Sequence, residues 1–93
     1  MKMTDTTIRQ GVSEPGSFRM NYTITYDKDN AACKVETEIK RKSAEGAPDR
    51  YIGHAACNVE PFRYTFQLTD SVTAEERRML ADDFEGTIKE LAK

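Results

Sequence analysis

The strongest constraint on the fold is a strict alternation of apolar and polar residues between Ser17 and Asp27. Every even position of this stretch is apolar: Phe18, Met20, Tyr22, Ile24 and Tyr26. Successive side chains of a β-strand point to opposite faces of the sheet. The alternation therefore predicts a strand with one buried face and one face exposed to water.

Three later segments continue this pattern and predict further strands at about residues 31–42, 50–59 and 62–68. The positions expected on the buried side are Cys33, Val35, Thr37 and Ile39, then Tyr51, Gly53, Ala55, Cys57 and Val59, then Phe62, Tyr64, Phe66 and Leu68. A four-residue loop at 27–30 predicts that Ile24 lies opposite Cys33. Pairing of Ile39 with Tyr51 would then place Cys57 opposite Cys33.

The last segment changes to helical spacing. Thr73-Ala74-Glu75-Glu76 has the form of a capping box. An apolar stripe at helical spacing follows, made of Leu80, Ala81, Phe84, Ile88 and Leu91. We therefore predict an α+β fold, a four-stranded antiparallel β-meander with one C-terminal α-helix packed across one face.

The domain organisation follows from the same patterns. Residues 1–16 show no sustained period and end in the turn signal Pro15-Gly16, which predicts a flexible N-terminal tail. Residues 17–93 are expected to form a single α+β domain. The chain has 93 residues, 38% of them hydrophobic, which is enough for one core without metals or several disulfides.

The net charge and the hydropathy of the chain predict where in the cell the protein is found. The formal net charge is −2, so there is no global basic field to attract nucleic acid or anionic lipid. No apolar run approaches the ~20 residues of a membrane span, and the first residues lack the apolar core of a signal peptide. We expect a cytoplasmic protein that does not contact a membrane. In that compartment Cys33 and Cys57 are expected as free thiols, with a Cys33–Cys57 disulfide as the less favoured alternative.

The residues that could support catalysis or metal binding do not converge. His54, the one histidine, is expected on the wetted face, whereas Cys33 and Cys57 are expected on the buried one, so the three cannot close a tetrahedral zinc site. Glu36 and Glu38 are flanked by lysines, which favours a solvated charge ladder over an acid/base pair. The sequence therefore predicts no catalytic residue, no metal, no cofactor and no enzymatic activity.

One binding hypothesis concerns the wetted face of the sheet. Strand parity places basic residues there in excess over Glu36 and Glu38: Arg19, Lys34, Lys40, Lys42, Arg50 and Arg63. Neighbouring polar side chains, Asn21, Thr23, Thr25 and Gln67, could donate hydrogen bonds to phosphates or bases. This face could therefore bind a single-stranded nucleic acid.

The predicted order of strands and helix adds a resemblance. The passage from Phe66-Gln67-Leu68 to Thr73-Ala74-Glu75-Glu76, after four antiparallel strands, is similar in outline to the positive-cofactor and Whirly class of single-strand-binding domains. That resemblance implies nucleic-acid binding through the sheet and pairing as dimers. The chain departs from the pattern because its strand aromatics, such as Tyr22 and Phe66, are expected under the helix and not on a stacking platform.

The competing hypothesis is protein–protein association, and the sequence favours it. In a simple meander the strand at 17–27 is an edge, and its outward residues Asn21, Thr23 and Thr25 leave that edge poorly guarded by charge. Pairing with a second copy would give an eight-stranded sheet in a homodimer. A different protein could use the same edge or an acidic helix face with Asp82, Asp83 and Glu90, next to an outward Met79. We expect a small non-enzymatic interaction module, with single-stranded nucleic-acid binding as the alternative.

Overall fold

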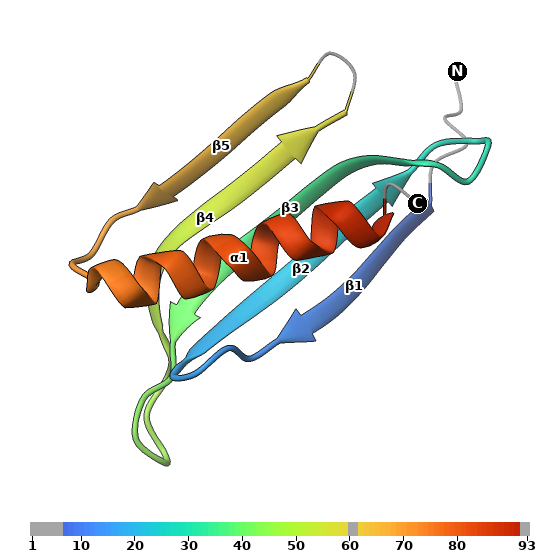
Figure 1. Cartoon of the computed structure of the whole chain (residues 1–93). Coiled ribbons are helices and arrows are strands. Elements are labelled where there is room, and N and C mark those ends of the chain that lie inside the picture. Colours follow the sequence, from blue (N-terminus) through green and yellow to red (C-terminus); the bar gives the residue numbers. More distant parts are fainter. Residues whose placement is uncertain (1–6, 60–61, 92–93) are drawn as a thin grey trace.

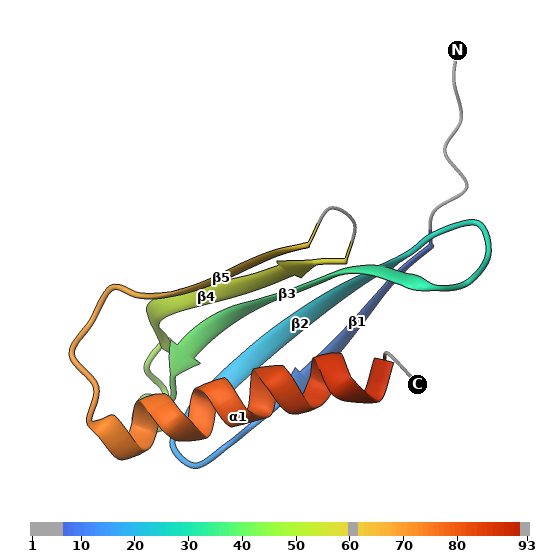
Figure 2. The ribbon, with the colours of Figure 1, turned by 45° about the horizontal axis from the view of Figure 1, so that its top comes forward.

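A computed structural model describes residues 7–59 and 62–91 and shows one antiparallel sheet with one helix on it. The elements are β1 (Thr7–Ser13), β2 (Phe18–Tyr26), β3 (Ala32–Arg41), β4 (Arg50–Asn58), β5 (Arg63–Leu68) and α1 (Ala74–Leu91). The strands lie in chain order, β1-β2-β3-β4-β5. The helix crosses the middle of the sheet diagonally (Figure 1) and leaves the opposite face open (Figure 2). The predicted α+β class, antiparallel sheet and C-terminal helix are confirmed.

The predicted number of strands is wrong, because the sheet has five. The additional strand, β1, lies within the segment predicted to be a flexible tail, of which residues 1–6 lie outside the described residues. It pairs with β2 along its whole length, from Thr7 opposite Tyr26 to Ser13 opposite Met20. All of its residues except Ser13 are exposed, so the sequence carries no buried-face alternation that would reveal a strand.

The β2–β3 hairpin is shifted by two residues from the predicted register. Ile24 lies opposite Val35, not Cys33, because the loop is one residue longer than predicted (27–31) and the pairing then skips Cys33. Asp27 organises the loop: its Oδ1 accepts hydrogen bonds from the backbone nitrogens of Asp29 and Ala31, at 2.9 and 3.0 Å. This two-residue shift keeps the side chains that pair with Phe18 to Thr25 on their predicted faces, whereas Ala32, opposite Tyr26, changes face.

A second irregularity, a β-bulge between β3 and β4, moves two side chains to the face of the sheet opposite the predicted one. Ile39 pairs with Gly53 and Lys40 with Tyr51, so Ile52 is skipped. Ile52 is fully buried, whereas Tyr51 is 46% exposed. The predicted alternation placed Tyr51 on the buried face, and so its neighbour Ile52 on the wetted one. Both positions are wrong, because simple alternation does not anticipate a β-bulge.

The core lies between the helix and the central strands. Its largest fully buried side chains are Phe18, Met20, Ile39, Ile52, Leu80 and Phe84. The predicted helix stripe is confirmed at Leu80 and Phe84, and Ile88 and Leu91 are partly buried against the same core. Met79 also packs against this core, so the prediction that it points outward is wrong.

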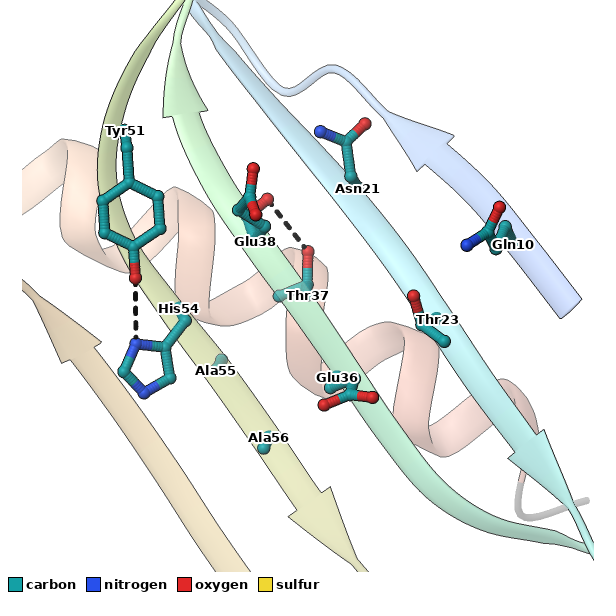
Figure 3. Close-up of a pocket in the computed structure, with 10 residues that line it drawn as sticks. All are labelled: Gln10, Asn21, Thr23, Glu36, Thr37, Glu38, Tyr51, His54, Ala55 and Ala56. Carbon is teal, nitrogen blue, oxygen red and sulfur yellow. Dashed lines mark hydrogen bonds between the residues drawn. The ribbon is translucent and has the colours of Figure 1, made fainter. Parts of the chain in front are cut away.

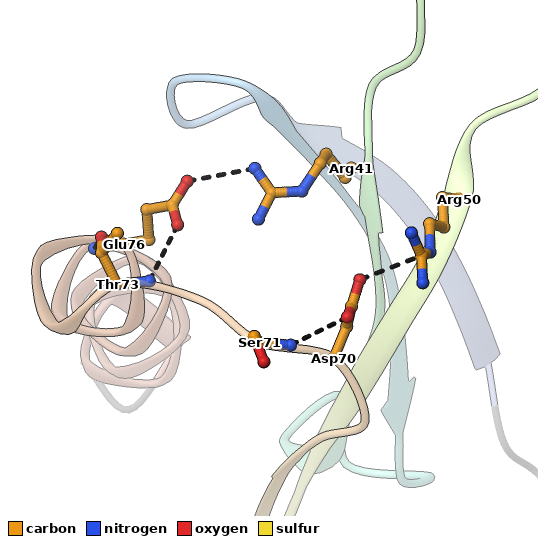
Figure 4. Close-up of polar contacts among 6 residues, drawn as sticks. All are labelled: Arg41, Arg50, Asp70, Ser71, Thr73 and Glu76. Carbon is orange, nitrogen blue, oxygen red and sulfur yellow. Dashed lines mark hydrogen bonds and ion pairs between the residues drawn. The ribbon is translucent and has the colours of Figure 1, made fainter.

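Polar contacts fix the start of the helix (Figure 4). The capping box is confirmed: Glu76 N donates to Thr73 Oγ1 at 3.0 Å, and Thr73 N donates to Glu76 Oε1 at 2.9 Å. Glu76 Oε2 also pairs with the Arg41 guanidinium at 3.1 Å. Asp70, just before the helix, pairs with Arg50 at 3.3 Å. These contacts attach the β5–α1 connection to the ends of β3 and β4.

Gly53 is required by the close approach of β4 and β5. A Cβ atom added there would lie 2.2 Å from the backbone oxygen of Gln67, whereas one added at Gly86 would meet nothing within 4 Å. We predict that Gly53→Ala lowers the free energy of unfolding by about 1–3 kcal/mol and that Gly86→Ala raises it by up to about 1 kcal/mol. Urea denaturation of both variants checks this, and equal effects would contradict the strand register.

The capping box predicts a pH dependence. The hydrogen bond from the Thr73 backbone, together with the Arg41 guanidinium, lowers the pKa of Glu76 below its ordinary value of 4.5. A carboxyl with a lowered pKa stabilises the fold above its unfolded-state pKa, and this contribution is lost as pH falls through its folded-state pKa. The stability difference between the wild type and Glu76→Gln should therefore shrink as pH falls below 4.5 in urea titrations. An equal stability difference at neutral and at acidic pH would contradict this role of the ionised Glu76 carboxylate.

Candidate interaction surfaces

The open face of the sheet contains a polar depression of about 470 Å³. Figure 3 shows side chains from four strands on this face: Gln10, Asn21, Thr23, Glu36, Glu38, Tyr51 and His54. The Tyr51 hydroxyl and His54 Nδ1 lie 3.2 Å apart. The predicted position of His54 on the wetted face agrees with this arrangement.

The predicted basic residues do not form one free patch. Arg19 pairs with Glu14 at 3.0 Å and also with Asp49. Lys34 pairs with Glu36 at 3.6 Å, and Lys40 pairs with Glu38 at 3.0 Å. Much of the positive charge expected on this face is therefore matched by carboxylates beside it.

The remaining predicted basic residues lie apart. Arg63 is opposite Asn58 on the open face, and Lys42 follows β3, where its backbone nitrogen donates to Ser17 O at 2.8 Å. Arg50 is not on the open face. It lies opposite Arg41, whose guanidinium stacks 4.7 Å from the Phe18 ring centroid on the helix side. The bulge at Ile52 accounts for this change of face.

The prediction that β2 is a free edge is wrong. Asn21, Thr23 and Thr25 lie on a strand paired with β1 on one side and β3 on the other. Their side chains reach the open face, but their backbone groups are in the middle of the sheet. Among the residues that the structure describes, the free edges of the sheet belong to β1 and β5.

The described cysteines and acidic residues do not gather into a metal centre. Cys33 and Cys57 are free thiols, and Cys57 lies opposite Val35 rather than Cys33. Burial raises the pKa of the Cys57 thiol. Within residues 7–59 and 62–91, no three His, Cys, Asp or Glu side chains are grouped so that they could hold a metal ion.

Asp83 has a structural position that the sequence did not indicate. It was predicted on an outward acidic face, but it points toward the sheet. Its carboxylate accepts hydrogen bonds from the Ser13 and Tyr22 hydroxyls, both at 2.7 Å. Burial, with Asp83 beside the hydroxyl, raises the pKa of Tyr22 well above its ordinary value. Asp83 thereby connects α1 to β1 and β2, so a polar helix residue holds the edge strand in place.

An apolar groove of about 620 Å³ lies between β5 and α1. It is lined by Cys57, Phe62, Tyr64 and Ile88. Gly86 also lines it and, having no side chain, exposes the helix backbone at that point. Phe62 is 73% exposed and Tyr64 is 39% exposed. The sequence correctly grouped the β5 aromatics on the helix side but did not show that the helix leaves them partly uncovered.

Comparison with known proteins gives no functional guide. No protein-family model, curated protein or solved structure matches this chain. In the part of the chain that the structure describes, no helix is both long enough and apolar enough to cross a membrane.

The Asp83 contacts predict a specific loss of stability. Tyr22→Phe removes a hydrogen bond to a carboxylate, and such bonds contribute about 1.5–3 kcal/mol, so we expect a loss of that order in the free energy of unfolding. Tyr26→Phe is the matched control, since no hydrogen bond joins its hydroxyl to the described residues and its ring, under Arg9, is retained. Equal effects of the two variants in urea denaturation would contradict the role of Asp83.

Proposed function

We propose that this protein is a non-enzymatic interaction module that binds an extended segment of another protein along the free edge of β5. The observation that carries the proposal is the apolar groove beside that edge, where Phe62 is 73% exposed. An unpaired edge and an apolar groove are the two elements of recognition by strand addition.

The backbone of β5 supports the first element. β5 pairs with β4 from Arg63 to Leu68 and ends the sheet on that side. An edge strand presents unpaired N–H and C=O groups to an incoming chain. A partner strand would add main-chain hydrogen bonds there, and its alternate side chains would point to the helix side.

The groove supports the second element and suggests the chemistry of the partner. Its apolar lining would accept aliphatic or aromatic side chains of that strand. Asp82, Glu85 and Lys89 of the helix also border it, so carboxylates outnumber the single ammonium group. We therefore expect the bound segment to combine apolar residues with a lysine or arginine.

Single-stranded nucleic-acid binding through the open face is the second candidate. One observation favours it: Tyr51, predicted to be buried, is 46% exposed beside His54 and could stack on a base. Against it, Glu36 and Glu38 line the same depression and would repel phosphates. Protein binding at β5 is therefore the better-supported proposal.

The proposal can be tested by panning a random-peptide display library against the protein and synthesising the enriched peptides. Fluorescence anisotropy should give affinities that fall at least about tenfold in Phe62→Ala, as expected for a residue that contributes about 1.4 kcal/mol or more. Val12→Ala, which removes a similarly exposed side chain at the other edge (64% exposed), should leave the affinities unchanged. Glu85→Lys should weaken binding of peptides that carry a basic residue.

Two results would contradict the proposal. One is that no peptide is enriched, and the other is that the peptides bind the wild type and Phe62→Ala equally. Titration of a labelled single-stranded DNA and RNA at low salt tests the second candidate. Binding that falls steeply with salt and is lost in Tyr51→Ala would support it over protein binding.

A further inference from the structure

We propose that two copies of this protein associate through antiparallel pairing of their β1 strands, with a two-fold axis at Gln10. This interface uses the opposite edge of the sheet from β5, so it does not depend on the proposed partner segment.

The first observation is that β1 is an unprotected edge. Natural edge strands are commonly guarded by lysines, prolines, bulges or short length. β1 has seven residues, Thr-Ile-Arg-Gln-Gly-Val-Ser, with no lysine or proline, and its register with β2 is unbroken. Its single charged residue is Arg9.

The second observation is where its apolar residues lie. Ile8 lies opposite Thr25 and Val12 opposite Asn21, so both side chains belong to the open, polar face of the sheet. They are 61% and 64% exposed. Neither contributes to the core of a single copy, and they flank Gln10 symmetrically.

The third observation is that the strand is self-complementary about Gln10. A two-fold interface requires that if one residue faces a second, the second also faces the first. Centring on Gln10 pairs all residues of β1: Thr7 with Ser13, Ile8 with Val12, and Arg9 with Gly11 of the other copy. Both copies then bury β-branched apolar pairs on the open face and match hydroxyl residues at the ends.

The charge of Arg9 favours a two-fold axis at Gln10 over an axis at Arg9 itself. Moving the axis to Arg9 would set the two arginines directly opposite each other, which is destabilising, and would leave Val12 without a counterpart in β1. With the axis at Gln10, each Arg9 faces a glycine. Its guanidinium lies 5.6 Å from the centroid of Tyr26 on the neighbouring β2, so the charge is held on the inner side of its own strand.

The size of the contact sets the expected strength. Stable interfaces bury about 1,200–2,000 Å² in total, and pairing of two short edge strands falls below this range. We therefore expect a reversible dimer with a dissociation constant in the micromolar range rather than a permanent one. Joining the two sheets would place both helices on the same face of a continuous sheet.

Sedimentation velocity over a concentration series, with charge substitutions at Ile8 and Val12, tests both the dimer and its register. Ile8→Lys with Val12→Lys places like charges opposite each other and should give a monomer. Ile8→Lys with Val12→Glu places opposite charges at the same positions and should restore the dimer. The two side chains lie about 13 Å apart within one strand, so they do not neutralise each other in a single copy.

Phe62→Lys is the control at the other edge and should dimerise like the wild type. Because Ile8, Val12 and Phe62 are all largely exposed, these variants should fold, and circular dichroism verifies this. A wild type that stays monomeric at millimolar concentration would overturn the proposal. So would dimerisation lost in Phe62→Lys, or equal behaviour of the two charge variants.

An oxidative cross-link gives an independent measurement of the axis. In a Cys33→Ser background, Gln10→Cys should form an intermolecular disulfide efficiently, because residues directly opposite in an antiparallel pair have Cα atoms about 4.5–5.5 Å apart. Ile8→Cys would place its two thiols about 13 Å apart and should cross-link slowly. Equal yields on a non-reducing gel would contradict an axis at Gln10.

Discussion

A single helix is too narrow to cover this sheet, and the arrangement of its surfaces follows from that mismatch. An α-helix with its side chains is about 10–12 Å across, whereas five strands at about 4.8 Å spacing span roughly 19 Å between the outer strand axes. α1 therefore buries the central strands and leaves both edges partly uncovered (Figure 1). The core is confined to the middle, the aromatic side of β5 faces a groove, and β1 is bound mainly through its pairing with β2.

The direction of the helix is fixed by polar contacts at two points. Glu76 joins its first turn to Arg41 at the end of β3, and Asp83 joins its middle to Ser13 and Tyr22. Directly after Asp83, the centroid of the Phe84 ring lies 6.3 Å from that of Tyr22 and 5.7 Å from that of Tyr64. The helix is therefore held across the sheet, so the groove beside β5 is a fixed feature of the surface rather than a gap that the helix can close.

The sequence predicted the elements that bury a face and missed those that do not. The alternation of apolar and polar residues indicated the core positions Phe18, Met20 and Ile39. The capping-box pattern of Thr73 and Glu76 indicated where the helix begins. β1 was missed because it is exposed on both faces and is defined by its hydrogen bonds to β2. The reversed positions of Tyr51 and Ile52 come from a bulge, and the inward turn of Asp83 depends on hydroxyls more than sixty residues away in the chain. Local periodicity contains none of this information. Of the candidate surfaces, the wetted face was predictable, but the edges and the groove required the topology.

We propose that the molecule acts through the edges of its sheet and not through its open face. Amide hydrogen exchange measured by NMR at low and at high protein concentration tests this most directly. We expect fast exchange for the outward-pointing amides of β1 and β5 in dilute protein. As the protein concentration rises, the amides of β1 alone should become protected from exchange. Edge amides already protected in the dilute monomer, or concentration-dependent changes centred on Tyr51 and His54 of the open face, would contradict it.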